Sequence, residues 1–383
     1  MSHKLCWPSA RASGAVETDG GFAFQMRALS ELFDQTTVLV PVDMALRRES
    51  GNPVTGHNLT VVPLAHRPGR SPQARRMLIP IWLLKNLPRI VHAIREADVV
   101  HTPVPSMIGT YAMLLATVMR KPLIVRHCGD WNDRGTAWKR FHRRFMELRA
   151  DAPHALMLAT GAGDTPPSPG TDVRWIFSTA LSESQLAALL PTTRARPALA
   201  PQIITVARQE AGKGTDVLIE AMPTLLRSHQ DIRLHVVGDG TLRERNQALA
   251  RDMGVLDRVV FHGSLPHNRV VGLLQEADIF CLPTSGEGFP KAVVEAMACG
   301  LPVVTSAVSV LPALVADAGC VVHENTAEKI ASAIEWCLQD TERYARMSAA
   351  AHRIARQYSL EAWRDRIGQL LNERWALRNA AFS

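Results

Sequence analysis

The sequence predicts an α/β protein made of two doubly wound, mainly parallel sheets, each covered by helices. Its 383 residues are too many for one ordinary core and suit two domains of under about 200 residues each. Short apolar runs alternate with amphipathic helical patterns over nearly the whole length, as in chains of βαβ units. The segment PTTRARPALAPQ (191–202), rich in Pro and small residues, interrupts this alternation, which restarts directly after it.

The strand candidates are short apolar runs between turn residues. In the first half they are Lys4–Trp7, Thr37–Pro41, Leu59–Val62, Asp98–His101, Pro122–His127, Ala155–Leu158 and, more weakly, Val173–Phe177. In the second half they are Ile203–Ala207, Arg233–Val237, Val259–His262, Ile279–Pro283, Pro302–Thr305 and Cys320–Val322. Apolar residues at three- and four-residue spacing predict helices between them, as at Asp216–Leu226 and Glu328–Leu338.

These elements predict the domain organisation. We expect a first domain over residues 1–190, a second over 200–357, and a last helix in 358–383 that packs back on the first domain. Parallel sheets bind ligands at the carboxyl ends of their strands, so we expect a cleft between the two domains.

Composition and cysteine usage narrow the class of protein. Hydrophobic residues make up 46% and charged residues 21%, as in soluble globular proteins. The longest apolar run, near Met77–Leu84, is far shorter than the roughly 20 residues of a spanning helix, and the N-terminus lacks a signal-peptide pattern. The six cysteines form no CxxC pair or Cys/His cluster, which predicts reduced thiols and no zinc site. We therefore expect a cytoplasmic protein.

The strongest chemical signal is ADIFCLPTSGEGFPKAVVEAMACGLPVVTS (277–306). An apolar strand ends at Pro283, a loop with glycines follows, and Pro290 starts a helix that Gly300 ends. Glu287 lies in the loop and Glu295 more than one turn into the helix, so both carboxylates can face one bound molecule.

The start of this helix is a predicted phosphate site, because amides at a helix N-terminus attract anions. A sugar on one side and a ribose on the other, joined by a diphosphate, would fit that geometry. The candidate binding residues beside Glu295 are Gly288, Phe289, Pro290, Lys291, Ala292 and Val293. The alternative is a capped helix with two solvated glutamates.

A second element, IITVARQEAGKGTDVLIEAM (203–222), adds two cations. A strand ends at Ala207, and Arg208 and Lys213 enclose a short loop before Gly214 leads into a helix. Such a pair can neutralise a diphosphate, Arg through a bidentate fork and Lys as a point charge. The alternative is a surface Arg and Lys in a basic protein.

The stretch 277–306 closely resembles the E-x7-E signature of family-four glycosyltransferases, retaining enzymes with the two-domain GT-B fold. The resemblance covers most of residues 200–340 and implies that Arg208 and Lys213 hold the donor's phosphates and stabilise the leaving group. It also implies that Glu287 orients the sugar's hydroxyls and that Glu295 accepts hydrogen bonds from the ribose. The family usually has Gly before this Arg, where Ala207 stands here. It works without a bound metal, and no other cofactor is implied.

Three further segments match the family more weakly. VVFHGSLPHNRV (259–270) resembles the loop that holds the nucleotide base through backbone atoms, here around Ser264 and Leu265. Gly20 and Gly21 precede an amphipathic helix and resemble a donor-facing glycine loop, although an ordinary turn explains them too. His127 ends an apolar strand where family members often contact the sugar or acceptor, although a strand-end histidine is often structural.

The excess of cations lies in the first half of the chain. Arg67–Arg95 and Trp138–Arg149 combine Lys and Arg with apolar and aromatic residues, a pattern typical of a helix on anionic lipid. Alternatively, the aromatic residues belong to the core and the cations to a solvated face. Nucleic acid is not an expected partner, because no recognition motif accompanies the charge.

We therefore expect a metal-independent, retaining hexosyltransferase that uses a nucleotide-diphosphate sugar and a glycan or lipid-linked acceptor in polysaccharide or glycolipid assembly. A nucleotide-sugar epimerase of the same fold and a non-catalytic sugar-nucleotide-binding subunit are the alternatives. A dehydrogenase is disfavoured, because Arg243 stands in place of the third glycine of the dinucleotide fingerprint in LHVVGDGTLRERNQALA (234–250).

Overall fold

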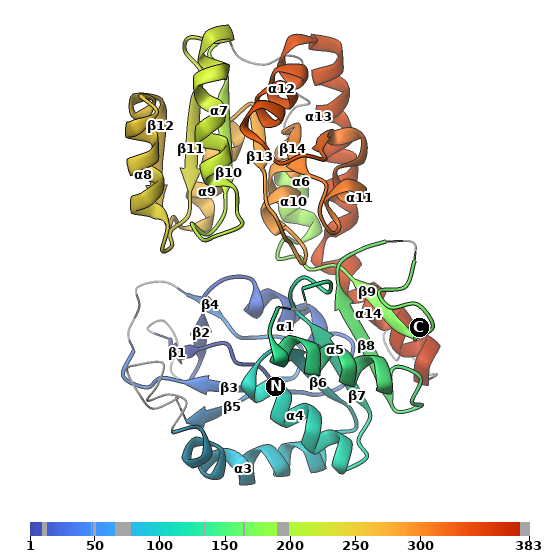
Figure 1. Cartoon of the computed structure of the whole chain (residues 1–383). Coiled ribbons are helices and arrows are strands. Elements are labelled where there is room, and N and C mark those ends of the chain that lie inside the picture. Colours follow the sequence, from blue (N-terminus) through green and yellow to red (C-terminus); the bar gives the residue numbers. More distant parts are fainter. Residues whose placement is uncertain are drawn as a thin grey trace. The chain divides into compact units, whose positions relative to one another are not determined.

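The chain forms two compact units in a computed structural model (Figure 1). Unit 1 contains Met1–Ala180 and the returning segment Leu360–Ser383, and unit 2 contains Leu181–Ser359. The structure describes residues 1–9, 14–46, 48, 51–65, 78–133, 135–163, 165–189 and 199–375. Most of the predicted linker, residues 191–198, lies outside the described residues.

Unit 1 contains two sheets. The first has the order β4-β2-β1-β3-β5 and consists of β1 (Cys6–Pro8), β2 (Val16–Thr18), β3 (Thr36–Val42), β4 (Asn52–Pro53) and β5 (Leu59–Ala65). The second is parallel and consists of β6 (Val100–Val104), β7 (Leu123–His127), β8 (Ala155–Thr160) and β9 (Val173–Ile176), in that order. The sequence did not predict β2 and β4, which pair antiparallel beside β1, because both are too short to show a period-two pattern.

Two layers of helices cover the strands of unit 1. Neighbouring strand residues point to opposite sides, so Ile124 lies in one apolar cluster and Val125 in the other. The first cluster includes α1 (Phe22–Ser30) and α14 (Leu360–Trp375). The second includes α3 (Ile79–Glu96), α4 (Met107–Val118) and α5 (Ala137–Arg149).

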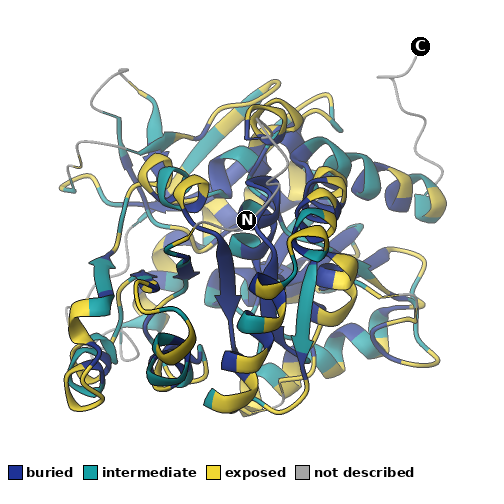
Figure 2. Ribbon diagram, turned by 90° about the horizontal axis from the view of Figure 1, so that it is seen from above, coloured by how far each residue is buried: buried dark blue, intermediate teal, exposed yellow. Residues whose placement is uncertain are grey.

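Unit 2 is built on one fully parallel sheet with the order β12-β11-β10-β13-β14-β15. Its strands are β10 (Gln202–Val206), β11 (Arg233–Val237), β12 (Val259–Gly263), β13 (Ile279–Leu282), β14 (Val303–Ser306) and β15 (Gly319–Val322). The strand residues are mostly buried, whereas the exposed residues lie mainly on helices and loops (Figure 2).

Helices precede, connect and follow the strands of unit 2. They are α6 (Glu183–Ala188), α7 (Thr215–Ser228), α8 (Arg243–Asp252), α9 (His267–Glu276), α10 (Lys291–Ala298), α11 (Leu311–Val315), α12 (Ala327–Gln339) and α13 (Thr341–Ala355). The helices α7 and α12 share an apolar cluster with the strands, with Leu218 and Ile334 among its fully buried members. Every predicted strand is present, with its ends shifted by a few residues at most. None of the described helices has the length and apolar character that crossing a membrane requires.

Candidate functional site

The strand order of unit 2 changes direction between β10 and β13. On one side of this point the sheet continues through β11 and β12, and on the other through β14 and β15. All these strands are parallel, so the loops after β10 and β13 leave the same edge of the sheet as neighbours. Such a switch point is the usual ligand site of wound sheets. The predicted residues Arg208, Lys213 and Glu287 lie in these two loops.

The loop after β10 packs tightly against the end of β13. Gly214, at the start of α7, has a φ of +72°, and a Cβ added to it would lie 1.8 Å from the Pro283 carbonyl oxygen. The Thr284 hydroxyl and the Ser285 amide both donate to the Gly212 carbonyl, at 2.9 and 2.8 Å. Only glycine fits such a close backbone approach at positive φ. This contact brings the two predicted loops together.

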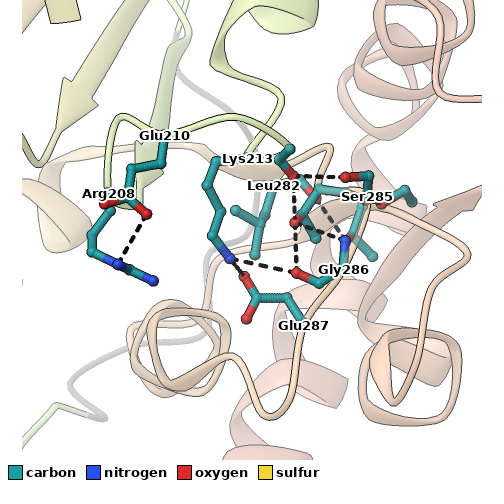
Figure 3. A network of polar contacts seen from close by, with 11 residues as sticks. Arg208, Glu210, Lys213, Leu282, Ser285, Gly286 and Glu287 are labelled. Carbon is teal, nitrogen blue, oxygen red and sulfur yellow. Dashed lines mark hydrogen bonds and ion pairs between the residues drawn. The ribbon is translucent and has the colours of Figure 1, made fainter. Parts of the chain in front are cut away.

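Lys213 and Glu287 form a largely buried ion pair at this junction (Figure 3). The Lys213 Nζ lies 2.5 Å from Glu287 Oε1 and 3.5 Å from the Gly286 carbonyl oxygen. The two side chains are only 18% and 16% exposed. The structure therefore joins two of the predicted catalytic residues directly.

Arg208 lies on the same loop as Lys213 and is also paired with a carboxylate (Figure 3). Its Nη1 lies 2.9 Å from Glu210 Oε2, and the Arg208 side chain is 72% exposed. The Glu210 amide donates to the Arg208 carbonyl at 2.8 Å, which curls the loop between them. Sequence reasoning did not single out Glu210, because an acidic residue two positions after an arginine has no signature of its own.

The predicted phosphate site is at the N-terminus of α10, which has no side-chain cap. The sequence predicted Pro290 as the first helical residue, but in the structure Pro290 is the N-cap and the helix begins at Lys291. The Val293 amide donates to the Pro290 carbonyl at 3.0 Å, so this predicted phosphate donor is engaged within the first turn. Lys291, Ala292 and Gly288 are half-buried. Phe289 is buried with its ring 5.3 Å from that of Tyr358, so it shapes the loop.

Glu295 lies beside a histidine that sequence reasoning missed. His267 is the first residue of α9, and its Nε2 lies 3.3 Å from Glu295 Oε1. The Glu295 side chain is 13% exposed and that of His267 is 52% exposed. The hydrogen bond with Glu295 raises the pKa of His267. His267 could have been found from its position in the sequence, because it lies two residues after Leu265 in the predicted base loop.

The predicted base loop connects β12 to α9. Ser264 is exposed and Leu265 is half-buried. Gly263 before them has a φ of +67°, and its carbonyl accepts a hydrogen bond from the Gly238 amide at 2.8 Å. The loop after β12 is thereby held beside the loop after β11, at the same edge of the sheet as the cations.

In unit 1 the predicted glycine pair lies just before α1, and His127 is the last residue of β7. Gly20 has a φ of +70° with open space around its Cβ position, and Gly21 is the N-cap of α1 without a side-chain cap. His127 ends β7 and is buried, with its ring 5.2 Å from Trp131 in an edge-on arrangement. Burial lowers the pKa of His127 to about 4, so the imidazole is neutral at neutral pH.

The helix α5 presents aromatic residues at the surface. Trp138 and Phe141 are 48% and 39% exposed, with rings stacked 5.6 Å apart. Arg140 and Arg144 of the same helix are also exposed, while His142 and Met146 are buried. The reading of Trp138 and Phe141 as core residues is therefore wrong. In the other basic segment, Arg67–Arg95, residues 67–77 lie outside the described residues.

Among the described residues, no group of three or more His, Cys, Asp or Glu side chains is arranged to hold a metal ion.

Comparison with solved structures identifies the fold. Sucrose-phosphate synthase of Thermosynechococcus elongatus superposes with a TM-score of 0.70 at 20% identity, covering 98% of this chain and 99% of that one. HepE of Anabaena, solved with UDP and glucose, superposes with a TM-score of 0.67 at 18% identity, covering 97% and 99%. The protein has the GT-B fold, as the sequence predicts.

Sequence comparison then identifies the family to which the second half is similar. Residues 194–354 match the family described as Glycosyl transferases group 1. A D-inositol 3-phosphate glycosyltransferase of Corynebacterium aurimucosum is 39% identical over 165 residues, 41% of this chain and 39% of the relative. A GDP-mannose-dependent alpha-(1-6)-phosphatidylinositol monomannoside mannosyltransferase of Mycolicibacterium smegmatis is 34% identical over 194 residues, 47% and 50% of the two chains. These matches span half or less of each relative, and together with the fold they support a glycosyltransferase.

Proposed function

We propose that this protein is a retaining glycosyltransferase that moves a hexose from a nucleotide-diphosphate donor to a hydroxyl of its acceptor. The observation that carries the proposal is at the switch point of unit 2, where Lys213 pairs with Glu287 on the loop that leads to α10, and Arg208 lies on the same loop as Lys213. Two cations and a helix N-terminus complement a diphosphate, and a carboxylate complements sugar hydroxyls.

In the proposed reaction the acceptor oxygen forms a bond to the anomeric carbon on the face from which the phosphate leaves. The bond between that carbon and the phosphate oxygen breaks, and the acceptor's proton passes to the departing phosphate. Arg208, Lys213 and the first turn of α10 stabilise the charge that develops on this phosphate, which is usually the largest catalytic contribution. Because protein cations do this work, we propose that no metal or other cofactor is needed.

The remaining predicted residues take supporting roles in the proposal. Glu295 accepts hydrogen bonds from the ribose, and the backbone of Ser264 and Leu265 borders the base. Gly20 and Gly21 of unit 1 bind the donor, and His127 contacts the transferred sugar or the acceptor. The names of two relatives specify an inositol phosphate and a phosphatidylinositol mannoside, which supports a glycan or lipid-linked acceptor in glycolipid or polysaccharide assembly.

We also propose that the protein works in the cytoplasm at an anionic membrane surface. The exposed residues of α5, which include Trp138, Phe141, Arg140 and Arg144, support this placement. Aromatic rings enter the headgroup region while arginines pair with anionic lipid.

The first experiment is a thermal-shift screen with UDP, GDP, ADP and their sugar conjugates. A ligand at one hundred times its dissociation constant adds about 2.7 kcal/mol to the unfolding free energy. One nucleotide series should stabilise the wild type and Lys329→Ala, a control on the exposed start of α12, but neither Lys213→Ala nor Glu295→Ala. If no nucleotide stabilises the wild type, the proposal fails.

Transfer is tested with the nucleotide sugar so identified, in the presence of EDTA. Formation of a glycoside with the donor's anomeric configuration, read by NMR, is expected. A changed sugar without acceptor dependence would indicate the epimerase, and binding without any turnover would indicate the non-catalytic subunit. Loss of transfer in EDTA, restored by a divalent cation, would contradict metal independence.

A further inference from the structure

Both cations of the proposed diphosphate site are paired with carboxylates of the protein itself (Figure 3). Glu287 Oε1 lies 2.5 Å from Lys213 Nζ, and Glu210 Oε2 lies 2.9 Å from Arg208 Nη1. The two pairs differ in their surroundings. The Lys213–Glu287 pair is more than four-fifths buried, whereas the side chains of Arg208 and Glu210 are 72% and 42% exposed.

These pairs oppose the binding of a diphosphate. A lysine ammonium has three hydrogen-bond donors, and Lys213 directs two of them to Glu287 and to the Gly286 carbonyl. A phosphate that takes over Lys213 must displace Glu287 or share the ammonium with it, and two anions so close repel one another. Arg208 faces the same competition from Glu210, two residues along its own loop.

The competition differs between the sugar nucleotide and the bare nucleotide. In the function proposed above, Glu287 accepts hydrogen bonds from the sugar's hydroxyls, which compensate the carboxylate for losing Lys213. Once the sugar has been transferred, that compensation is gone and the negative carboxylate remains next to the diphosphate. Re-forming the Lys213–Glu287 pair then favours departure of the nucleoside diphosphate.

We propose that Glu210 and Glu287 act as internal counter-ions, which exchange with the donor's diphosphate for Arg208 and Lys213 and promote release of the nucleoside diphosphate product. The inference rests on the proposed function of this site. It assigns a role to Glu210, which tunes product affinity without contacting the sugar, and a second role to Glu287.

The test measures the affinity for UDP and GDP by calorimetry, and their dissociation rates by stopped flow, in the wild type, Glu210→Gln and Glu287→Gln. Gln keeps the size of the side chain and removes its charge. We expect Glu210→Gln to bind the preferred nucleoside diphosphate about three-fold more tightly, since the pair is exposed, and to release it more slowly. Glu287→Gln should bind it more tightly still, because its pair is buried.

Binding of the nucleotide sugar, measured in the same variants, separates the proposed second role of Glu287 from a general effect of removing one negative charge. Glu210→Gln should tighten binding of the nucleotide sugar by the same factor as that of the bare nucleotide. Glu287→Gln should narrow or reverse the preference for the sugar conjugate, because it also loses an acceptor for the sugar's hydroxyls. The control is Glu342→Gln, whose carboxylate is 90% exposed and paired with Arg346 on α13, and it should change nothing.

Unchanged or weaker binding of the nucleoside diphosphate in both Glu210→Gln and Glu287→Gln would overturn the inference while leaving the proposed function in place. An equal gain in Glu342→Gln would overturn it too, because net charge would then be the cause. If neither the wild type nor any variant binds a nucleotide, the proposed function fails together with it. Glu210→Gln alters an exposed pair and is expected to keep the wild-type melting temperature, so its result stands even if Glu287→Gln does not fold.

Discussion

The pKa values of His267 and His127 are shifted in opposite directions, because the two rings have different surroundings. His267 is half-exposed and bonded to a carboxylate, which raises its pKa from the ordinary value of 6.5. His127 is buried with its ring against Trp131, and this burial lowers its pKa to about 4. Each shift is a statement about stability, because protons bind differently to the folded and unfolded chains.

The pair of His267 with Glu295 should stabilise the fold at acid to neutral pH. Since the folded pKa is raised, the contribution is fully present below pH 6.5 and is lost as the pH rises through the folded value. Half-exposure limits it to about 1 kcal/mol or less. Melting temperatures of the wild type and His267→Gln should therefore differ at about pH 6 and converge at about pH 9. A difference that stays constant with pH would contradict this.

His127 should make the fold less stable in acid. Its folded pKa is lowered to about 4, so the unfolded chain binds its proton first and stability is lost as the pH falls from 6.5 to about 4. The loss amounts to about 3 kcal/mol, as a shift of this size implies. In urea titrations across this range, His127→Gln should show a flatter dependence of unfolding free energy on pH than the wild type. Parallel profiles would show that another group carries the acid sensitivity.

At the scale of elements, the turn between β10 and α7 depends on Gly214. An alanine there would place its Cβ 1.8 Å from the Pro283 carbonyl oxygen, so one of the two loops has to move. We expect Gly214→Ala to lower the free energy of unfolding by more than about 2 kcal/mol. It should also weaken nucleotide binding, because the contact of Lys213 with Glu287 depends on the close approach of the two loops.

The matched control for this substitution is Gly254→Ala. Gly254 also has a positive φ, +68°, but no atom of the described residues lies within 4 Å of its Cβ position. Gly254→Ala should lower the free energy of unfolding only by the conformational strain of about 1 kcal/mol and should leave nucleotide affinity unchanged. Chemical denaturation and calorimetry measure both quantities. Equal losses in the two variants would mean that the contact with Pro283 has no part in the effect.

The exposed face of α5 predicts binding to anionic vesicles. Arg140→Gln combined with Arg144→Gln should weaken co-sedimentation with phosphatidylglycerol vesicles on the order of ten-fold or more, at about 1 kcal/mol per cation. Trp138→Ala combined with Phe141→Ala should weaken it as well. Trp336→Ala, an equally exposed tryptophan on α12, is the control. Equal binding to phosphatidylcholine vesicles by all proteins would contradict an electrostatic surface.

At the scale of the whole molecule, the last helix completes unit 1 although it follows unit 2 in sequence. Trp363 of α14 is fully buried, and the Arg126 guanidinium lies 5.2 Å from the centre of its ring. Arg126 is itself buried and directs both terminal nitrogens to Gln25 Oε1 of α1.

At the far end of α14, Arg374 donates to the carbonyls of Ala150 and Ala152, both at 2.7 Å. Helix α14 is therefore an integral part of unit 1.

Trp363→Ala should destabilise unit 1 by about 3–5 kcal/mol, through the cavity it leaves and the lost ring beside a buried cation. Unit 2 should still be stabilised by the nucleotide identified in the thermal-shift screen, since its core does not include α14. Calorimetry with and without that nucleotide checks both statements. Loss of nucleotide stabilisation in Trp363→Ala would show that the two units do not respond separately.

Much of the fold could be predicted from local patterns. The strands of unit 2 are short apolar runs with helices between them, and each is present close to its expected ends. Strand pairing could not be predicted in the same way, since β2 and β4 have only a few residues each. β2 is placed by its pairing with β1, and β4 by its pairing with β2. The sequence left open whether Trp138 and Phe141 face solvent or the core, because a helical stripe does not tell which side faces the core, and the structure shows both exposed.

The sequence by itself determined which residues are candidates for the proposed site, namely Arg208, Lys213, Glu287 and Glu295 on a strand–loop–helix framework. Residue type, turn glycines and spacing are local properties, and they can be read along the chain. Only the tertiary structure decided the partners, because Glu210 on Arg208, Glu287 on Lys213 and His267 on Glu295 depend on how loops fold back and on which loops meet at the switch point. Charge pairing acts through space over a few ångströms, and distance along the chain does not reveal it.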